Sequence, residues 1–374
     1  MPVEFEQSKS LVEVFQRFKY WGEKIEPVLE QFFKQERKNP YCVESGSEQV
    51  IDAIADLTLR GGKRQRVAFV GETFKLLGGE LTEHSEKAIL ATAAGVEILQ
   101  TQLLIHDDII DRAPLRRGGP TIHAQFYQRA LQEAFKIDQT QYGDSVAILA
   151  GDLTTYLACY PILRSSEISS SQKIRILDIL MLSGIDTFYG QLLDLFRDAK
   201  GFTTEEEILY LAFIKAGRSS AEAPMFIGAV LAGNEKEETF EKIKAYAVPA
   251  SMAGQLQDDI LGIFGDQDKL GKSALSDVAQ GKQTLLVLKA RECSDAKQLR
   301  ILESYVGKKD VTITEAELVK RVMVETGALD YVKNKAVLFS EKAREALQTW
   351  DESWGQKEKD FFEAVTVAAI QREY

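Results

Sequence analysis

Apolar residues recur along most of this chain at the three- and four-residue spacing of an amphipathic helix, whereas strand-like alternation is scarce. Only eight prolines interrupt the 374 residues, so the helices can be long. The pattern is clearest in GVEILQTQLLIHDD, SVAILAGDLTTYLACYPIL, KIRILDILMLSGIDTFYGQLLDLF and FEKIKAYAVPASMAGQLQDDILGIF, which are residues 95–108, 145–163, 173–196 and 240–264. Pro249 starts or kinks the helix in the last of these segments. The sequence therefore predicts an all-α fold.

The number of helices and the hydrophobic content of 45% predict a single domain over residues 1–374, built as a multi-helix bundle around a central cavity. An amphipathic helical pattern within the first sixty residues fits core or dimer packing better than a membrane anchor. Residues from about 289 to 374 are expected to form extra helices, in which Trp350 and Trp354 pack rather than bind a ligand. Small residues around Gly151 favour a close approach of two helices.

Two aspartate clusters lie within these apolar segments. The first contains Asp107, Asp108 and Asp111, and the second contains Asp258 and Asp259. Spacings of three and four residues place at least two carboxylates of the first cluster on one helix face, where their repulsion favours a cation. Mg²⁺ prefers one or two carboxylates together with waters and substrate phosphate oxygens. The clusters therefore predict a substrate that carries phosphate groups.

Acidic residues at a helix end can also be merely solvated. The flanking sequence argues against that reading here, because the segment before the first cluster is apolar and should be buried. Arg112, Arg116 and Arg117 follow the cluster, and guanidinium groups bind anions that a metal ion holds. His106, next to the cluster, is expected to pack rather than to act in catalysis.

The segment LRGGKRQR offers a second candidate anion site. Gly61 and Gly62 allow backbone amides to approach an anion, and Lys63, Arg64 and Arg66 can surround it. Taken alone, such a segment is more often a basic turn, and it is not a P-loop because the GxxxxGK[ST] pattern is absent. Its value depends on the other motifs.

GGKRQR, DDIID followed by two arginines, GQLQDD, FGD and GK occur in the order found in polyprenyl diphosphate synthases. From about Gly61 to Leu288 the chain resembles a short-chain member of the trans type, similar to the geranylgeranyl and farnesyl diphosphate synthases. The resemblance implies an isoprenoid synthase fold and a prenyltransferase that joins isopentenyl diphosphate to an allylic diphosphate. It also implies a homodimer.

The resemblance further implies a metal site with three Mg²⁺ ions, for which Mn²⁺ is expected to substitute. Asp107 and Asp111 would hold two ions against the allylic diphosphate, and Asp258 would hold the third. Asp108, Asp259 and Asp194 are included in the candidate metal set.

The candidate substrate site follows from the same resemblance. Arg116, Lys215 and Lys272 would neutralise the allylic diphosphate as it leaves. The cation formed then alkylates isopentenyl diphosphate and loses a proton, so no histidine or thiol is needed. The full substrate-binding set is Gly62, Lys63, Arg66, Gln100, Arg116, Arg117, Gln191, Lys215, Gln255, Lys272 and Lys282.

Three positions depart from the family pattern. Gly262 stands where many relatives have a third aspartate of the second cluster, which affects the surroundings of the third ion. Ala216 replaces a common threonine, and Gly254 stands where an aromatic residue often packs. These changes could alter affinity or geometry, although we expect activity to survive them.

Product length is expected to depend on the residues beneath the first cluster, along the helix that carries it. Gln102 and Leu103 precede Asp107 by five and four residues, and Leu99 lies a turn further back. Synthases that stop at farnesyl carry bulky aromatics at the two nearer positions. Because this chain has none, we expect geranylgeranyl diphosphate, with farnesyl or a longer chain as alternatives.

Two other functions remain open. A class I terpene cyclase also uses Mg²⁺ and aspartates, but the segment DDILGIFGD lacks its second metal motif of Asn or Asp, Ser or Thr, and Glu. The resemblance also implies that Lys63, Arg66 and Arg117, helped by Gln100, clamp the diphosphate of isopentenyl diphosphate, and a cyclase has no use for such a second diphosphate clamp. A non-catalytic subunit of a heteromeric synthase would typically lose aspartates that this chain keeps.

Charge and composition exclude some classes of protein. The net charge of −11 argues against a nucleic-acid partner, which needs a basic face. Cys42, Cys159 and Cys293 show no disulfide or metal spacing, which fits the cytoplasm. The N-terminus lacks a signal-peptide core, and we expect no integral membrane segment because no apolar run reaches the roughly eighteen residues required.

Overall fold

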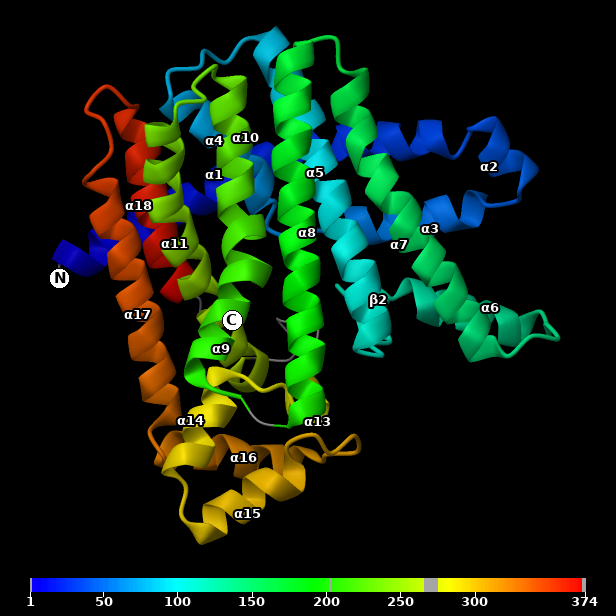
Figure 1. The fold of residues 1–374 in the computed structure, drawn as a ribbon, viewed down its shortest axis with the longest axis vertical. Coiled ribbons are helices and arrows are strands. Elements are labelled where there is room, and N and C mark those ends of the chain that lie inside the picture. Colours follow the sequence, from blue (N-terminus) through cyan, green and yellow to red (C-terminus); the bar gives the residue numbers. More distant parts are fainter. Residues whose placement is uncertain (1, 202, 266–274, 372–374) are drawn as a thin grey trace. The chain divides into compact units, whose positions relative to one another are not determined.

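The computed structural model describes residues 2–201, 203–265 and 275–371, and the regular structure in them is almost entirely helical (Figure 1). The helices are α1 (Pro2–Glu36), α2 (Pro40–Glu44), α3 (Glu48–Leu59), α4 (Gln65–Leu76), α5 (Glu83–Ile110), α6 (Ile122–Gln132), α7 (Gln139–Arg164), α8 (Ser170–Lys200), α9 (Glu205–Ala212), η1 (Phe213–Glu222), α10 (Ala223–Leu231), α11 (Glu237–Phe264), α13 (Leu275–Gln280), α14 (Leu285–Cys293), α15 (Ala296–Tyr305), α16 (Ile313–Glu325), α17 (Ala328–Leu347) and α18 (Gln356–Ile370). A two-stranded antiparallel ribbon, β1 (Leu115–Arg116) and β2 (Gly119–Pro120), is the sheet in this part of the chain. The all-α prediction is confirmed.

The residues group into two compact units, which we describe separately. The N-terminal unit comprises Phe15–Leu180 and Ile227–Asn234. The C-terminal unit comprises Met1–Val14, Met181–Phe226 and Glu235–Tyr374. The single domain that we expected from the sequence stays a prediction.

From Phe15 onward, helix α1 is packed into the N-terminal unit by its apolar face, as predicted. The side chains of Trp21, Ile25 and Leu29 are fully buried. The Trp21 indole lies so close to Gly71 of α4 that a Cβ there would stand 2.1 Å from the ring. Its Nε1 also donates a hydrogen bond of 2.8 Å to the buried carboxylate of Glu72. This part of the first helix therefore belongs to the core of the unit.

Helices α5 and α7 pack closely in the N-terminal unit because glycines remove side chains at two points. A Cβ on Gly95 would stand 2.6 Å from the carbonyl oxygen of Ala158. A Cβ on Gly151 would stand 2.1 Å from Nε2 of His106. The predicted role of Gly151 in close helix packing is therefore confirmed, and the tight contact fixes the end of α5.

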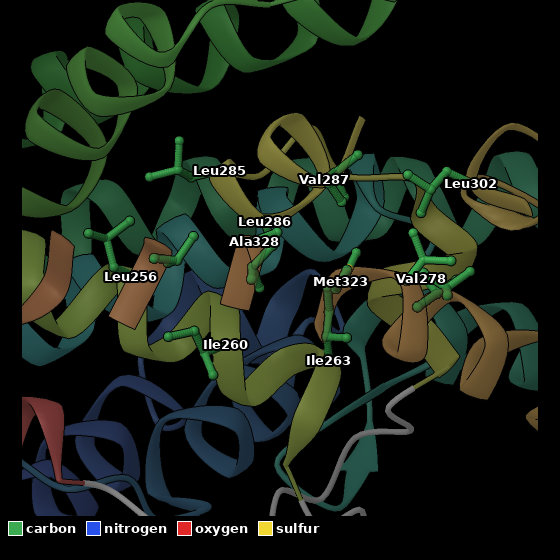
Figure 2. Packing of buried hydrophobic residues seen from close by; sticks show 14 of the residues in the cluster. Leu256, Ile260, Ile263, Val278, Leu285, Leu286, Val287, Leu302, Met323 and Ala328 are labelled. Atoms are coloured by element: carbon green, nitrogen blue, oxygen red, sulfur yellow. The ribbon is translucent and has the colours of Figure 1, made fainter. Parts of the chain in front are cut away.

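The C-terminal unit has its core around α11, with α17 running alongside it (Figure 1). Leu256, Ile260 and Ile263 project from α11 into a cluster that also receives side chains from α14 and α16 (Figure 2). Pro249 lies inside α11, which remains a helix on both sides of it. The core thereby fixes the helix that carries the second aspartate cluster.

A second group of large buried side chains packs against the N-terminal half of α11. The buried Tyr246 donates a hydrogen bond of 2.8 Å from its hydroxyl to the carbonyl oxygen of Phe362. Trp350 packs against Tyr246 and Trp354, with ring centroids 5.2 and 5.3 Å apart. The prediction that the two tryptophans pack is confirmed.

Three helices are long and apolar enough to cross a membrane, judged by length and composition alone: α5, α7 and α8. Our prediction that no apolar segment has that length was therefore wrong, because we required an uninterrupted run and these helices carry isolated polar residues. The burial of the most apolar stretch of 18 residues differs between α5 and the other two helices. In α5, 78% of this stretch is buried inside the protein, whereas in α7 and in α8 only 39% is buried.

Candidate active site

The first aspartate cluster lies at the C-terminal end of α5. The amide of Asp111 donates the last helical hydrogen bond, 2.8 Å long, to the carbonyl oxygen of Asp107, and Arg112 then ends the helix in the left-handed conformation with φ of 51°. Asp107 and Asp111 are partly exposed, whereas Asp108 is 1% exposed. The structure thus brings Asp107 and Asp111 to one open face, as the spacing predicted, and places Asp108 inside the protein.

Arg116 binds two carboxylates of this cluster. The ribbon β1–β2 turns the chain back, and Nε of Arg116 donates to Oδ1 of Asp108 at 2.7 Å while Nη2 lies 3.1 Å from Oδ2 of Asp107. Burial alone would lower the pKa of Arg116, but the carboxylates of Asp108, Asp107 and Asp111 more than offset this effect and raise it. The guanidinium is therefore a permanent positive charge beside Asp107.

A second group of cations surrounds a buried acid in the same unit. Nη1 of Arg64 donates to Oε2 of Glu97 at 2.6 Å, and both side chains are almost fully buried. Burial lowers the pKa of Arg66 and of Arg117, and the Glu97 carboxylate counteracts it in both. One buried acid thus stands among three arginines, so this group carries a surplus of positive charge that suits an anion.

The backbone of Gly62 lies next to Arg117, one of the three arginines near Glu97. Its φ is 113°, a conformation that favours glycine, and a Cβ there would stand 3.3 Å from Nη2 of Arg117. Lys63 and Gln100 are partly exposed, and Gln100 follows Glu97 by one helical turn on α5. The predicted clamp residues therefore belong to neighbouring elements of one unit.

The C-terminal unit contributes a second set of predicted residues, Asp194 and Gln191 on α8 and Lys215 on η1. Nζ of Lys215 lies 3.2 Å from Oδ2 of Asp194. The close approach of the two helices depends on Gly190, since a Cβ there would stand 3.1 Å from Cβ of Lys215. Helix η1 is a π-helix, a form that recurs at functional sites.

The second aspartate cluster lies on α11. Asp258 is exposed, while Asp259 is partly exposed and accepts a hydrogen bond of 2.9 Å from Nε2 of Gln255. The space beside Gly254 is open, because a Cβ there would meet nothing within 4 Å. Lys282 lies in the loop that precedes α14 and is partly exposed. The predicted Lys272 lies outside the described residues.

The candidate metal ligands divide between the two units. Asp107 and Asp111 belong to the N-terminal unit, and Asp258 belongs to the C-terminal unit. Over the ranges that the structure describes, no three His, Cys, Asp or Glu side chains form a group that could hold a metal by themselves. Partly exposed carboxylates in ones and twos fit Mg²⁺, which takes its other ligands from water and phosphate oxygens.

The residues beneath the first cluster differ in exposure. Leu103 is partly exposed, Leu99 is 6% exposed and Gln102 is fully buried. The amide of Gln102 lies 3.0 Å from Nδ1 of His106, whose Nε2 faces the carbonyl oxygen of Ile148 at 3.3 Å. The two ring nitrogens of His106 therefore face a side-chain amide on α5 and a backbone carbonyl on α7. His106 packs against α7, as predicted.

Sequence reasoning missed several charged residues at these sites. Glu97 and the partner role of Arg64 were overlooked, although an acid inside an apolar helix was a usable signal. A further network joins α8 to η1, where Arg218 contacts Asp186 and donates from Nε to Glu222 at 3.3 Å. The sequence offered no signal for the Arg218 contacts, because Asp186 is far away in the sequence and an arginine four residues before a glutamate is common on helices.

The structure is that of an all-helical protein in which the two aspartate clusters and the neighbouring cationic side chains lie on helices or directly beside them. The chain belongs to the polyprenyl synthetase family, whose model matches residues 48–324. The family resemblance, the isoprenoid synthase fold and the assignment as a prenyltransferase are therefore confirmed.

Curated relatives and solved structures agree with this membership. The chain is 31% identical to a geranylgeranyl diphosphate synthase of Methanosarcina mazei, over 87% of this chain and 91% of that protein. It is 32% identical to a short chain isoprenyl diphosphate synthase of Methanocaldococcus jannaschii, over 76% and 79%. A geranylgeranyl pyrophosphate synthase of Corynebacterium glutamicum, solved with isoprenyl diphosphate and magnesium, superposes with a TM-score of 0.87 at 25% identity, covering 94% of this chain and 99% of that chain.

Proposed function

We propose that this protein is a Mg²⁺-dependent trans-prenyltransferase that condenses isopentenyl diphosphate with an allylic diphosphate to make geranylgeranyl diphosphate. The observation that carries the proposal is the end of α5, where Arg116 binds Asp107 and Asp108 and Asp111 lies on the open face beside Asp107. The names of the relatives support the same reaction, and the magnesium in the Corynebacterium structure supports the metal.

The residues of the chain divide the reaction between them. Asp107, Asp111 and Asp258 would hold the ions, three in number, and bound Mg²⁺ would supply positive charge that stabilises the departing diphosphate. Arg116 and Lys215 would contact the allylic diphosphate and favour breakage of its carbon–oxygen bond.

The second substrate would be held by the arginines around Glu97. Arg66, Arg117 and Lys63 would grip the diphosphate of isopentenyl diphosphate. Its double bond attacks the allylic cation, forming the new carbon–carbon bond, and the resulting cation loses a proton. The released diphosphate is the base, so no side chain has to accept that proton.

Product length is the finer part of the proposal. Leu99, Gln102 and Leu103 include no aromatic ring that would block a prenyl tail, which supports a twenty-carbon product. A longer product is the second candidate, and a relative favours it: the chain is 32% identical to a geranylfarnesyl diphosphate synthase of Aeropyrum pernix over 80% of its length.

The protein is proposed to act as a homodimer in the cytoplasm. Leu149, Leu153, Tyr156, Tyr160 and Leu163 form an exposed apolar stripe along α7, with Tyr156 72% exposed. A monomer rarely exposes such a stripe, so a second copy is the proposed cover. The unpaired cysteines fit a reducing compartment.

The first experiment is incubation of the purified protein with Mg²⁺, labelled isopentenyl diphosphate and, separately, dimethylallyl, geranyl and farnesyl diphosphate. A discrete twenty-carbon product after dephosphorylation is expected. Failure to elongate any of the three primers, from folded protein, would favour a terpene cyclase or a non-catalytic subunit.

The matched variant for this experiment is Asp107→Ala. It should lose at least a hundredfold in turnover because its carboxylate helps to hold the metal, while the melting temperature stays close to that of the parent. Turnover at the parental rate in this variant would remove Asp107 from the metal site.

A further inference from the structure

Arg197 lies in the last turn of α8, and its side chain is 3% exposed. Nε donates to the Thr203 hydroxyl at 2.8 Å, just beyond the helix, and Nη2 donates to the carbonyl oxygen of Gln283 at 2.8 Å. Nη1 lies 3.9 Å from Oδ1 of Asp194. One buried guanidinium therefore contacts three segments of the C-terminal unit.

Two of those segments carry predicted site residues, because α8 carries Asp194 and the loop before α14 carries Lys282. The other carboxylate oxygen of Asp194, Oδ2, is 3.2 Å from Nζ of Lys215. Gln283 follows Lys282 directly in the loop before α14. A continuous set of contacts thus runs from Lys215 through Asp194 and Arg197 to the backbone beside Lys282.

The loop that carries Lys282 is held on its other sides as well. Gly281 has φ of 66° and packs against Gly307, where a Cβ would stand 2.8 Å from Cα of Gly307. The side chain of Gln283 donates to the carbonyl oxygen of Gly281 at 3.0 Å and accepts from Nη1 of Arg291 at 2.7 Å. The loop is therefore a defined structure, and Arg197 is the contact that joins it to α8.

Nη1 of Arg197 is buried and has no hydrogen-bond partner within the described residues. Leaving a charged donor unsatisfied costs free energy, so a merely structural arginine would be expected to complete its contacts. Asp194 lies in the direction of this nitrogen, slightly beyond hydrogen-bond length. A small movement of Asp194 would complete the pair.

We propose that Arg197 is a positioning residue that sets the spacing between the Asp194–Lys215 pair and Lys282. The inference rests on the proposed function, in which Lys215 contacts the allylic diphosphate, and adds that Lys282, a member of the predicted substrate-binding set, contacts the same group. Arg197 itself touches no substrate. Its fork of donors is suited to hold a side chain and two loops at once, which a lysine ammonium cannot reproduce.

The test is steady-state kinetics of Arg197→Lys, which keeps the charge and loses the fork. We expect kcat to fall at least tenfold and KM for the allylic diphosphate to rise, because small displacements of binding groups are costly. KM for isopentenyl diphosphate should stay within about twofold, as its proposed clamp belongs to the N-terminal unit. Unchanged kcat, or an equal rise of both KM values, would overturn the proposal.

Arg291→Lys is the matched control, since Arg291 holds the same Gln283 by its side chain but does not contact Asp194. It should leave the allylic KM within about threefold. A loss equal to that of Arg197→Lys would mean that the loop needs anchoring of any kind, and the specific role of Arg197 would be refuted.

Chemical rescue provides an independent readout. Arg197→Ala should regain at least fivefold in kcat when guanidinium is added at low millimolar concentration, whereas ammonium should have no effect. If guanidinium fails to rescue a variant that melts cooperatively, the proposal is wrong. Two further measurements distinguish a failure of this proposal from a failure of the proposed function. The parent enzyme should be active, and Lys215→Ala should lose activity. If the parent is inactive, or if Lys215→Ala is as active as the parent, the proposed function itself is wrong.

Discussion

At the scale of single residues, the sites are built from charges whose partners decide their roles. Asp107 and Asp108 are neighbours in sequence, yet one is partly exposed and the other is buried against Arg116. Spacing in the sequence was sufficient to predict that Asp107 and Asp111 share a face. It could not predict which aspartate is buried, because that depends on an arginine returned by the β1–β2 ribbon.

The prediction for product length concerns Leu103. Leu103→Phe should shorten the main product by at least one five-carbon unit, because an aromatic ring would occupy the path of the growing tail. Chromatography of the dephosphorylated products gives the chain length directly. Leu338→Phe, on the exposed surface of α17, is the control, and an unchanged product from Leu103→Phe would place the floor of the cavity elsewhere.

A second residue-scale prediction concerns Glu205, which joins α9 to α14 and α17. Burial alone would raise its pKa, but hydrogen bonds from Lys289, Lys335 and Tyr331 lower it to about 2. A carboxylate with a depressed pKa stabilises the fold above its unfolded pKa of about 4.3, and this stability is lost as the pH falls towards 2.

Glu205→Gln should therefore lower the free energy of unfolding by about 1 kcal/mol at pH 7, since solvent screens part of the interaction. The difference from the parent should shrink as the pH falls below about 4. Denaturant unfolding at pH 7 and pH 3.5 measures it, and a difference that stays constant over this range would contradict the assignment.

At the scale of elements, the long helices followed from the periodic apolar pattern. The segment expected at 240–264 corresponds to α11, Glu237–Phe264, and the segment 95–108 lies inside α5. The pattern could not reveal that Phe213–Glu222 is a π-helix, because the choice between α and π depends on packing against other elements. The contacts of Arg197 with Thr203 and Gln283, and of Arg218 with Asp186, were missed for the same reason, since these partners lie outside the helix that carries each arginine.

The α5–α7 contact yields a prediction about stability. Gly151→Ala should destabilise the protein by about 1–3 kcal/mol, because the new methyl group would overlap the His106 ring. Replacing the ring as well, in the double variant with His106→Ala, should recover part of the loss. Thermal unfolding provides the measurement.

Gly254→Ala is the control for that pair, since its Cβ would enter open space within a helix and should stabilise by about 0.5–1 kcal/mol. Additive losses from Gly151→Ala and His106→Ala would show that the two side chains do not compete for one space.

At the scale of the whole molecule, composition and motifs predicted the fold class and the family. The motifs lie between Gly61 and Leu288, and the family model extends this to residues 48–324. The sequence could not show how the chain divides into compact units, because each unit contains segments far apart in the chain.

The last prediction concerns assembly. Tyr156→Asp should convert a dimer into monomers, because it places a charge in the middle of the apolar stripe on α7. Sedimentation velocity measures the mass in solution. Glu303→Lys, at an exposed position of α15, tests whether a charge change alone has this effect, and a parent protein that sediments as a monomer would exclude the proposed dimer.

The π-helix η1 also has a consequence for comparing this chain with other sequences. A π-turn contains one residue more than the α-turn that it replaces. A relative with an ordinary α-helix at this place should therefore carry one residue fewer between the counterparts of Lys215 and Ala223. An ungapped alignment across this segment would assign either the lysine or every position after it to the wrong counterpart.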